Sequence, residues 1–163
     1  MADVLVAYYT RTGTSETLAR DLAGRLGADL DPIRTATSYA GAAGFRRGVW
    51  HSILHRTPEV SFGKDPADYA AVVLAGPIWA GRMAAPLLGY VKANRGRIVG
   101  AAAVCVSGSG GAYPKAFAGL QTLLGRPLLA RAALAERAVK TGEAGSGLEA
   151  FAAALRPRLP TAA

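Results

Sequence analysis

The chain of 163 residues has a single cysteine, Cys105, and only two histidines. One cysteine cannot form an internal disulfide, and no pair of cysteines has metal-binding spacing. Because Cys105 lies inside the apolar run 98–106, we expect a buried and inert thiol. His51 and His55 stand four residues apart on an expected helix. No acidic or cysteine partner is near them in the sequence, so we expect no metal site there.

Long hydrophobic runs are also missing. No apolar stretch reaches the roughly 20 residues that a membrane-spanning helix needs. No basic region precedes an apolar stretch near the N-terminus, so we expect no signal peptide and no membrane span. These absences favour a cytoplasmic protein.

Acidic residues are few, with 11 Asp and Glu against 19 Lys and Arg, which gives a formal net charge of +8. A compositional bias toward arginine and alanine explains this excess without any function. The functional alternatives are attraction to an anionic cofactor, to an acidic protein or to nucleic acid. Arg46-Arg47 and the Arg95, Arg97 pair are close together, and no aromatic residues interleave a basic stripe. We therefore do not expect nucleic-acid binding.

Apolar runs of strand length alternate along the chain with segments of helical pattern, which predicts an α/β fold. The length suits one domain spanning residues 1–163, and no repeat or linker divides it. Strands are expected at 4–9, 29–33, 68–74, 97–106 and 130–139. Helices are expected at 15–26, 45–56, from Pro86 onward, at 114–124 and at 148–155. Alternating strands and helices indicate a parallel sheet.

Right-handed crossovers leave few strand orders, and two particular strands show which known order fits best. Residues 4–9 are continuously apolar, which is typical of a strand covered on both faces. Pro32 lacks a backbone donor, so residues 29–33 should form an edge strand. We predict a three-layer, doubly wound fold with a five-stranded parallel sheet in the order 2-1-3-4-5.

Residues 36–66 form the least regular part of the sequence. Gly41, Gly44 and Gly48 should loosen it. A helical pattern nevertheless covers 45–56, with an apolar stripe made of Phe45, Val49, Trp50, Ile53 and Leu54. We expect Trp50 to pack on the core, with the lining of a pocket as the alternative.

The loop after the first strand has a distinctive composition. It reads Thr10-x-Thr12-Gly13-x-Ser15 and leads into a helix. Hydroxyls and backbone N–H groups at a helix start can bind a phosphate. Threonine and serine are also ordinary helix caps, which is the structural alternative. Neither the Gly-Lys-Ser/Thr ending of nucleotide hydrolases nor a Gly-x-Gly-x-x-Gly fingerprint is present.

Two further unusual loops follow the third and fourth strands, at residues 77–81 and 107–111. In open α/β sheets, ligands bind beyond the carboxyl ends of the strands, where the strand order reverses. The three loops should therefore meet at one edge of the sheet, and together they are more specific than any one of them.

The chain resembles the flavodoxin-like family over its whole length. The residues from Tyr8 to Ser15 resemble the family's phosphate loop. Asp68-Tyr69, the segment 76–81 and Pro86 resemble its flavin-ring loop, and the glycine- and serine-rich segment 107–111 resembles its second ring loop. The resemblance implies FMN as the cofactor and the fold of a short-chain flavodoxin, because the insertion that splits the fifth strand of long-chain flavodoxins is absent.

The resemblance also gives a set of expected FMN-binding residues. Trp79 would offer an aromatic face to the flavin ring, although it could instead be a hydrophobic plug. Tyr113 would cover the other face, or else pack on its own helix. Arg11 would add charge near the phosphate or point to solvent. The full set is Thr10, Arg11, Thr12, Gly13, Thr14, Ser15, Pro77, Ile78, Trp79, Ala80, Gly81, Ser107, Gly108, Ser109, Gly110, Gly111 and Tyr113.

No nucleophile–base pair or paired catalytic carboxylates stand out, so we expect electron or hydride transfer through the flavin. A flavodoxin-type carrier would exchange electrons with a redox partner protein. The alternative is an NAD(P)H-dependent reductase of quinones or similar small acceptors, and a third reading is a binding module without FMN. We favour the carrier because no residue marks a nicotinamide site. The sequence does not indicate the oligomeric state.

Overall fold

A computed structural model describes residues 2–161 of the chain. Its main sheet contains five parallel strands in the order β2-β1-β5-β7-β8, which confirms the predicted order 2-1-3-4-5. The strands are β1 (Val4–Tyr8), β2 (Asp29–Pro32), β5 (Ala71–Trp79), β7 (Ala101–Ser107) and β8 (Arg131–Ala135). As Pro32 indicated, β2 lies at the edge of the sheet.

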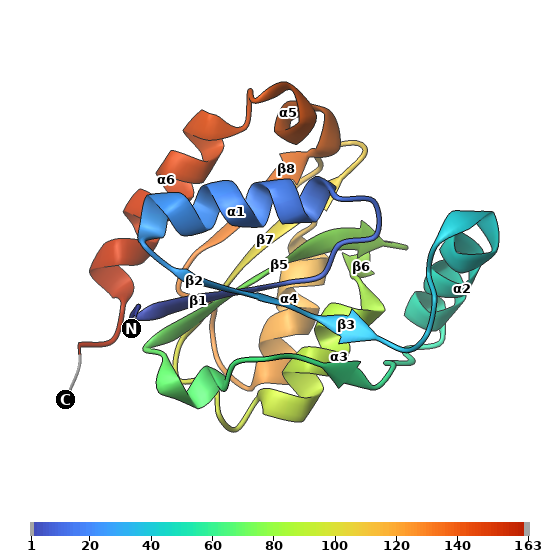
Figure 1. The fold of residues 1–163 in the computed structure, drawn as a ribbon, viewed down its shortest axis with the longest axis horizontal. Coiled ribbons are helices and arrows are strands. Elements are labelled where there is room, and N and C mark those ends of the chain that lie inside the picture. The colour runs from blue at the N-terminus through green and yellow to red at the C-terminus, as the bar shows by residue number, and fades with distance from the viewer. Residues whose placement is uncertain (1, 162–163) are drawn as a thin grey trace.

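Helices cover both faces of this sheet and complete three layers (Figure 1). One face carries α1 (Thr14–Leu26), α5 (Glu136–Thr141) and α6 (Gly145–Leu155), and the other carries α3 (Ala85–Asn94) and α4 (Pro114–Leu124). Alternate residues of β1 point to opposite sides, as a strand's period of two requires. Val4 and Val6 belong to the core under α1 and α6, whereas Leu5 and Ala7 belong to the core over α3 and α4.

The thiol of Cys105 lies in the second of these cores and is fully buried, as predicted. Burial raises its pKa to about 11, because a thiolate would lose its hydration there.

The two aspartates of the edge strand hold the chain where it returns to the sheet. The buried carboxylate of Asp31 accepts hydrogen bonds from the backbone N–H of Gly63 at 2.9 Å and of Lys64 at 2.7 Å. The hydroxyl of Tyr69 donates to Asp29 at 2.7 Å. The short 3-10 helix η1 (Pro66–Asp68) lies between these contacts and leads into β5.

Between β2 and β5 the chain leaves the main sheet, and a short two-stranded ladder joins the two ends of this segment. β3 (Arg34–Thr35) pairs antiparallel with β4 (Val60–Ser61), and α2 (Gly41–Ile53) lies between them. Figure 1 shows α2 set to the side of the sheet, on the side where β5 ends.

Two of the three glycines predicted to loosen this region, Gly44 and Gly48, allow close packing of α2. A Cβ added at Gly44 would lie 2.1 Å from the carbonyl carbon of Tyr39, and one at Gly48 would lie 3.0 Å from the ring of Trp79. The buried face of α2 consists of Gly44, Gly48 and Ser52. Small residues here let the helix backbone approach the aromatic side chains directly.

The predicted apolar stripe of α2 faces away from the core. Phe45, Trp50, Ile53 and Leu54 are between 51% and 60% exposed. The prediction that Trp50 packs on the core was therefore wrong, because the glycine face of the helix takes the buried side. Val49 is partly buried.

The segment from Gly76 to Trp79, predicted as a tight loop, continues strand β5. Ile78 and Trp79 favour extended backbone, and the turn comes later, at Ala80 and Gly81. Both turn residues have positive φ, 47° and 76°, as a two-residue hairpin turn of type I′ requires. The chain then returns antiparallel in β6 (Arg82–Met83), where Trp79 pairs with Arg82.

The remaining boundaries differ from prediction at both C-terminal strands. The fourth strand begins at Ala101 instead of residue 97. The fifth ends at Ala135, because α5 begins at Glu136, where an i,i+4 ion pair with Lys140 favours helix. The helix α4 has the predicted bounds, and α6 begins three residues before the predicted start. A final 3-10 helix, η2 (Arg156–Arg158), follows α6.

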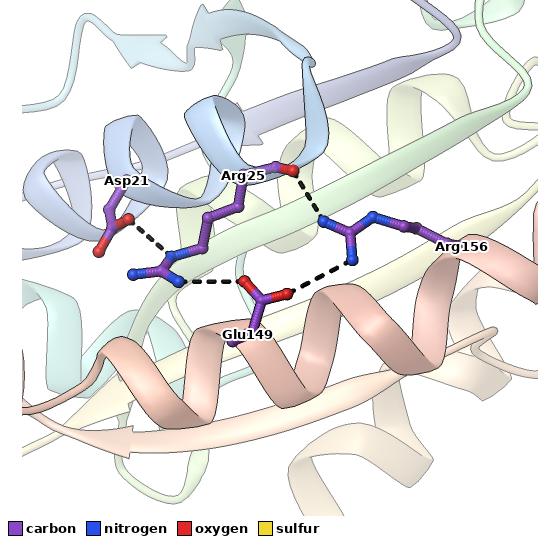
Figure 2. A network of polar contacts seen from close by, with 4 residues as sticks. All are labelled: Asp21, Arg25, Glu149 and Arg156. Atoms are coloured by element: carbon purple, nitrogen blue, oxygen red, sulfur yellow. Dashed lines mark hydrogen bonds and ion pairs between the residues drawn. The ribbon is translucent and has the colours of Figure 1, made fainter.

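Charged side chains link the end of α1 to α6 across the surface (Figure 2). The guanidinium of Arg25 donates to Asp21 at 2.8 Å and to Glu149 at 3.1 Å, while Arg156 donates to the backbone carbonyl of Arg25 at 2.9 Å. Exposed pairs of this kind contribute roughly 0–1 kcal/mol each. The network therefore aligns two helices that the apolar core already holds.

Two glycine substitutions test the packing of α2. Gly44→Ala should lower the free energy of unfolding by about 1–3 kcal/mol, since the added methyl meets fixed backbone. The matched control is Gly119→Ala in α4, where a Cβ would meet no atom within 4 Å. That change should raise stability by about 0.5–1 kcal/mol through helix propensity. Urea or thermal unfolding measures both, and stabilisation by both changes would contradict the packing of α2 on Tyr39.

Candidate functional site

A cavity of about 170 Å³ lies where β1, β5 and β7 end. It brings together residues of all three segments that the sequence predicted to meet, although the second contributes the end of strand β5 and not its turn, Ala80 and Gly81. The predicted residues that line it are Thr10, Arg11, Thr12, Thr14, Ser15, Pro77, Ile78, Trp79, Ser107 and Gly108. Val106, Phe45 and Glu136 complete the lining.

The first loop is shaped by Gly13, which has a φ of 99° at the N-cap of α1. Its N–H donates to the hydroxyl of Thr10 at 2.9 Å, which closes the loop. Within the described part of the chain, no side chain caps α1, so the N–H groups at the helix start lack the usual partner. These N–H groups and the positive end of the helix dipole favour an anion at this point.

Phe45 extends the site to α2. The guanidinium of Arg11 lies 5.4 Å from the centre of the Phe45 ring, which is cation–π distance. Phe45 is 51% exposed and lines the cavity, so an aromatic surface is accessible at its mouth. The apolar stripe in the sequence predicted that Phe45 is buried, and no sequence pattern indicated its contact with the first loop.

Glu136 is the acidic residue of the cavity lining, and sequence reasoning missed it. Its carboxylate accepts a hydrogen bond from the Thr14 hydroxyl at 3.1 Å and contacts the Lys140 ammonium at 2.9 Å. The hydrogen bond from Lys140 holds the pKa of Glu136 below its ordinary value, assisted by Thr14. It is therefore a poor base for Thr14. This residue falls inside the predicted strand 130–139. In the structure, α5 begins at residue 136 and brings it beside α1.

Trp79 borders the cavity but is largely enclosed by protein. Its side chain is 5% exposed, and its ring centre lies 5.6 Å from that of Tyr9 and 4.9 Å from that of Tyr39. Gly48 of α2 lies against the same indole. Burial in this cluster raises the pKa of Tyr9 to about 12. A flavin stacked on Trp79 stays a prediction, and it requires the covering groups to move.

The third loop is folded on itself by hydroxyl hydrogen bonds. Ser107 accepts from the N–H of Gly110 at 2.9 Å, and the hydroxyls of Ser109 and Tyr113 lie 2.9 Å apart. Hydrogen bonds from Ser107 and Ser109 lower the pKa of Tyr113. A Cβ at Gly111 would lie 3.3 Å from the Tyr113 ring, so that ring packs on its own loop.

Several predicted residues lie outside the lining of this cavity. Ser109, Gly110, Gly111 and Tyr113 belong to the far part of the third loop, and Gly13 shapes the first loop from behind. Ala80 and Gly81 border a different cavity, next to Lys115 and Leu120 of α4. Their roles in cofactor binding stay predictions.

Comparison with solved structures places this architecture among flavoproteins. A flavoprotein from Lactobacillus acidophilus, crystallised in complex with FMN, is 17% identical, with a TM-score of 0.67 over 86% of this chain and 98% of its own. A candidate flavoprotein from Bacteroides eggerthii is 21% identical, with a TM-score of 0.71 over 93% and 99%. Oxidised flavodoxin 2 from Bacillus cereus is 13% identical, with a TM-score of 0.58 over 96% and 99%.

The chain has the flavodoxin-like fold. The predicted resemblance and fold class are thereby confirmed at the level of architecture. No protein-family model matches the chain, and no curated protein sequence matches it.

Two classes of site are not found in residues 2–161. No helix there is long and apolar enough to cross a bilayer. No three or more His, Cys, Asp and Glu side chains gather there in a way that could hold a metal ion. His51 instead contacts the hydroxyl of Tyr39 at 2.8 Å, and His55 lies 2.6 Å from the guanidinium of Arg82.

Proposed function

We propose that the protein binds FMN and transfers electrons through it. The observation that carries the proposal is the first loop, where an uncapped helix start, four hydroxyl residues and Arg11 border a cavity at the carboxyl ends of the strands. A phosphate is one of the anions that such a helix start binds. The flavoprotein from Lactobacillus acidophilus, crystallised in complex with FMN, supports the choice of ligand.

The cavity suits the phosphate end of FMN better than the whole molecule. Its volume of about 170 Å³ is below the ~300–1,000 Å³ that is typical of small-molecule sites. We propose that the phosphate lies within the cavity and the ring at its mouth, beside Phe45, Ile78 and Gly108. A Cβ at Gly108 would meet no atom within 4 Å, so the loop leaves space on that side.

Bound FMN would supply the redox chemistry, namely the acceptance and release of electrons or a hydride. The chain's own residues would bind and orient it. The hydroxyls of Thr10, Thr12 and Ser15 would hold the phosphate, and Arg11 would balance its charge. The backbone of the second and third loops would face the ring.

Titration of the purified protein with FMN tests this proposal. We expect saturable binding with a dissociation constant in the micromolar range or below, followed by the visible spectrum and the flavin fluorescence. FAD should bind more weakly, because the loop has no dinucleotide fingerprint. A protein that binds neither flavin would overturn the redox function and leave the binding-module reading.

Thr12→Ala tests the phosphate contact separately from the ring contacts. The loss of a hydrogen bond to a charged group should weaken FMN binding by roughly 1–3 kcal/mol. Riboflavin, which has no phosphate, should bind equally to the variant and to the unmodified protein. An equal loss of affinity for both ligands would mean that Thr12 has a structural role only.

Glu136→Gln should have the opposite effect. Its carboxylate lies beside the first loop and would repel the FMN phosphate. Neutralising it should tighten FMN binding by roughly 1 kcal/mol, the Coulomb energy of unit charges about 4 Å apart in water. Riboflavin affinity should not change. The matched control is Glu143→Gln, which makes the same charge change at a residue outside the cavity lining.

We propose further that the protein is an electron carrier that serves a redox partner protein, with an NAD(P)H-dependent reductase as the alternative. NADPH alone should leave the bound flavin of a carrier oxidised, and adding a separate reductase should bleach it. The bleaching rate should then fall steeply with salt, as charge-steered docking does. Rapid, saturable bleaching by NADPH alone, reversed by a quinone, would establish the reductase.

A further inference from the structure

A second cavity, of about 240 Å³, lies at the C-terminal end of α2. It is bounded by α2 and the residues after it, by β6, by α3 and by Leu123 of α4. Five cationic or imidazole side chains line it: His51, His55, Arg56, Arg82 and Lys92. Among the described residues that line it there is no Asp or Glu, and it shares no lining residue with the first cavity.

The charges around this cavity are not compensated by protein. In residues 2–161, the ion pairs involve Arg20, Arg25, Arg97, Lys140 and Arg156, and none involves Arg56, Arg82 or Lys92. The polar contact of Arg82 is the ring of His55, 2.6 Å away, which carries no negative charge. Three cations, from the segment after α2, from β6 and from α3, therefore line one cavity that no carboxylate of the described residues lines.

A buried hydroxyl in the same cavity wall has no partner. Ser52 is 3% exposed, and its Oγ makes no hydrogen bond with the described residues. Leaving such a group unsatisfied costs about 1–3 kcal/mol, so native structures seldom keep one without a reason. A ligand that accepts this hydrogen bond removes the cost.

Helix stability alone does not explain the arrangement. His51, His55 and Arg56 stand near the C-terminal end of α2, where positive charge interacts favourably with the helix dipole. Arg82 and Lys92 come from β6 and α3, and the dipole of α2 does not account for them. The unpartnered Ser52 is likewise unexplained by the dipole.

We infer that this cavity binds the phosphate or pyrophosphate group of a small molecule. A guanidinium matches two phosphate oxygens at once, and an ammonium adds a point charge. The Ser52 hydroxyl, which neighbouring atoms cover, would turn toward the ligand to donate a further hydrogen bond. The site is separate from the phosphate loop of the first cavity. The β5–β6 hairpin runs between them, because Trp79 borders the first cavity and its ladder partner Arg82 borders the second.

Calorimetric titration with inorganic pyrophosphate tests this inference. The protein is first saturated with FMN, so that the Thr10–Ser15 loop cannot take up the probe. We expect one site whose affinity falls with added salt. Arg82→Gln and Lys92→Gln should each weaken binding about tenfold or more, the usual loss for a charged hydrogen-bonding partner. Arg95→Gln, an exposed arginine outside the cavity lining, is the matched control and should bind as before.

Ser52→Ala separates a binding role from a structural one. In the absence of pyrophosphate, removing an unpartnered buried hydroxyl should leave the melting temperature unchanged or raise it. The same change should weaken pyrophosphate binding several-fold. Unchanged affinity in the Ser52, Arg82 and Lys92 variants, or no binding to the FMN-loaded protein, would falsify the inference.

Parallel titrations distinguish the sources of the phosphate group. Tighter binding of NADP⁺ or NAD⁺ than of pyrophosphate indicates a nucleotide, whereas tighter binding of pyrophosphate or phosphate indicates a free anion. If the chain binds no FMN, the titration is repeated on Thr12→Ala without FMN. Binding that survives Thr12→Ala but is lost in Arg82→Gln still assigns the second cavity, so the two proposals fail separately.

Discussion

Parallel pairing of β1, β5 and β7 determines where polar groups can gather in this molecule. All three strands are buried on both faces, so polar side chains can gather only beyond the ends of the strands. Because the strands run in one direction, the loops after them meet at a single edge. The first cavity is the result, with hydroxyls from one loop, apolar walls from the second and a serine and a glycine from the third.

The use of acidic residues explains why basic groups remain free. The chain has 11 acidic residues against 19 basic ones, and several of the acidic residues hold other parts of the structure in place. Asp31 holds backbone N–H groups, Asp29 accepts from Tyr69, and Glu149 links α6 to Arg25. Glu136 is held by Lys140 beside the first loop. The cations around the second cavity are among the basic residues that form no ion pair within residues 2–161, and the proposed phosphate group would supply one.

Strong patterns in the sequence predicted the frame but not the details of either cavity. The apolar strand 4–9 and Pro32 selected the flavodoxin-like sheet order as the best fit, and Thr10–Ser15 indicated the first loop. No sequence pattern predicted that Phe45 and Glu136 line the first cavity, because their positions depend on packing between segments far apart in the chain. The error at α2 has a definite cause. A helical apolar stripe predicts the buried face only when side-chain volume decides the packing, and here the absence of side chains at Gly44 and Gly48 decides it.

Helix α2 contributes to both cavities from opposite ends. Phe45, near its start, lines the first cavity, and His51 and Ser52, near its end, line the second. Its buried face has almost no side-chain volume to interlock with Tyr39 and Trp79, so its position depends on close backbone contact at Gly44 and Gly48. A ligand that holds one end of such a helix also restricts the other. Any coupling between the two cavities must then be reciprocal, because each ligand changes the other's binding free energy by the same amount.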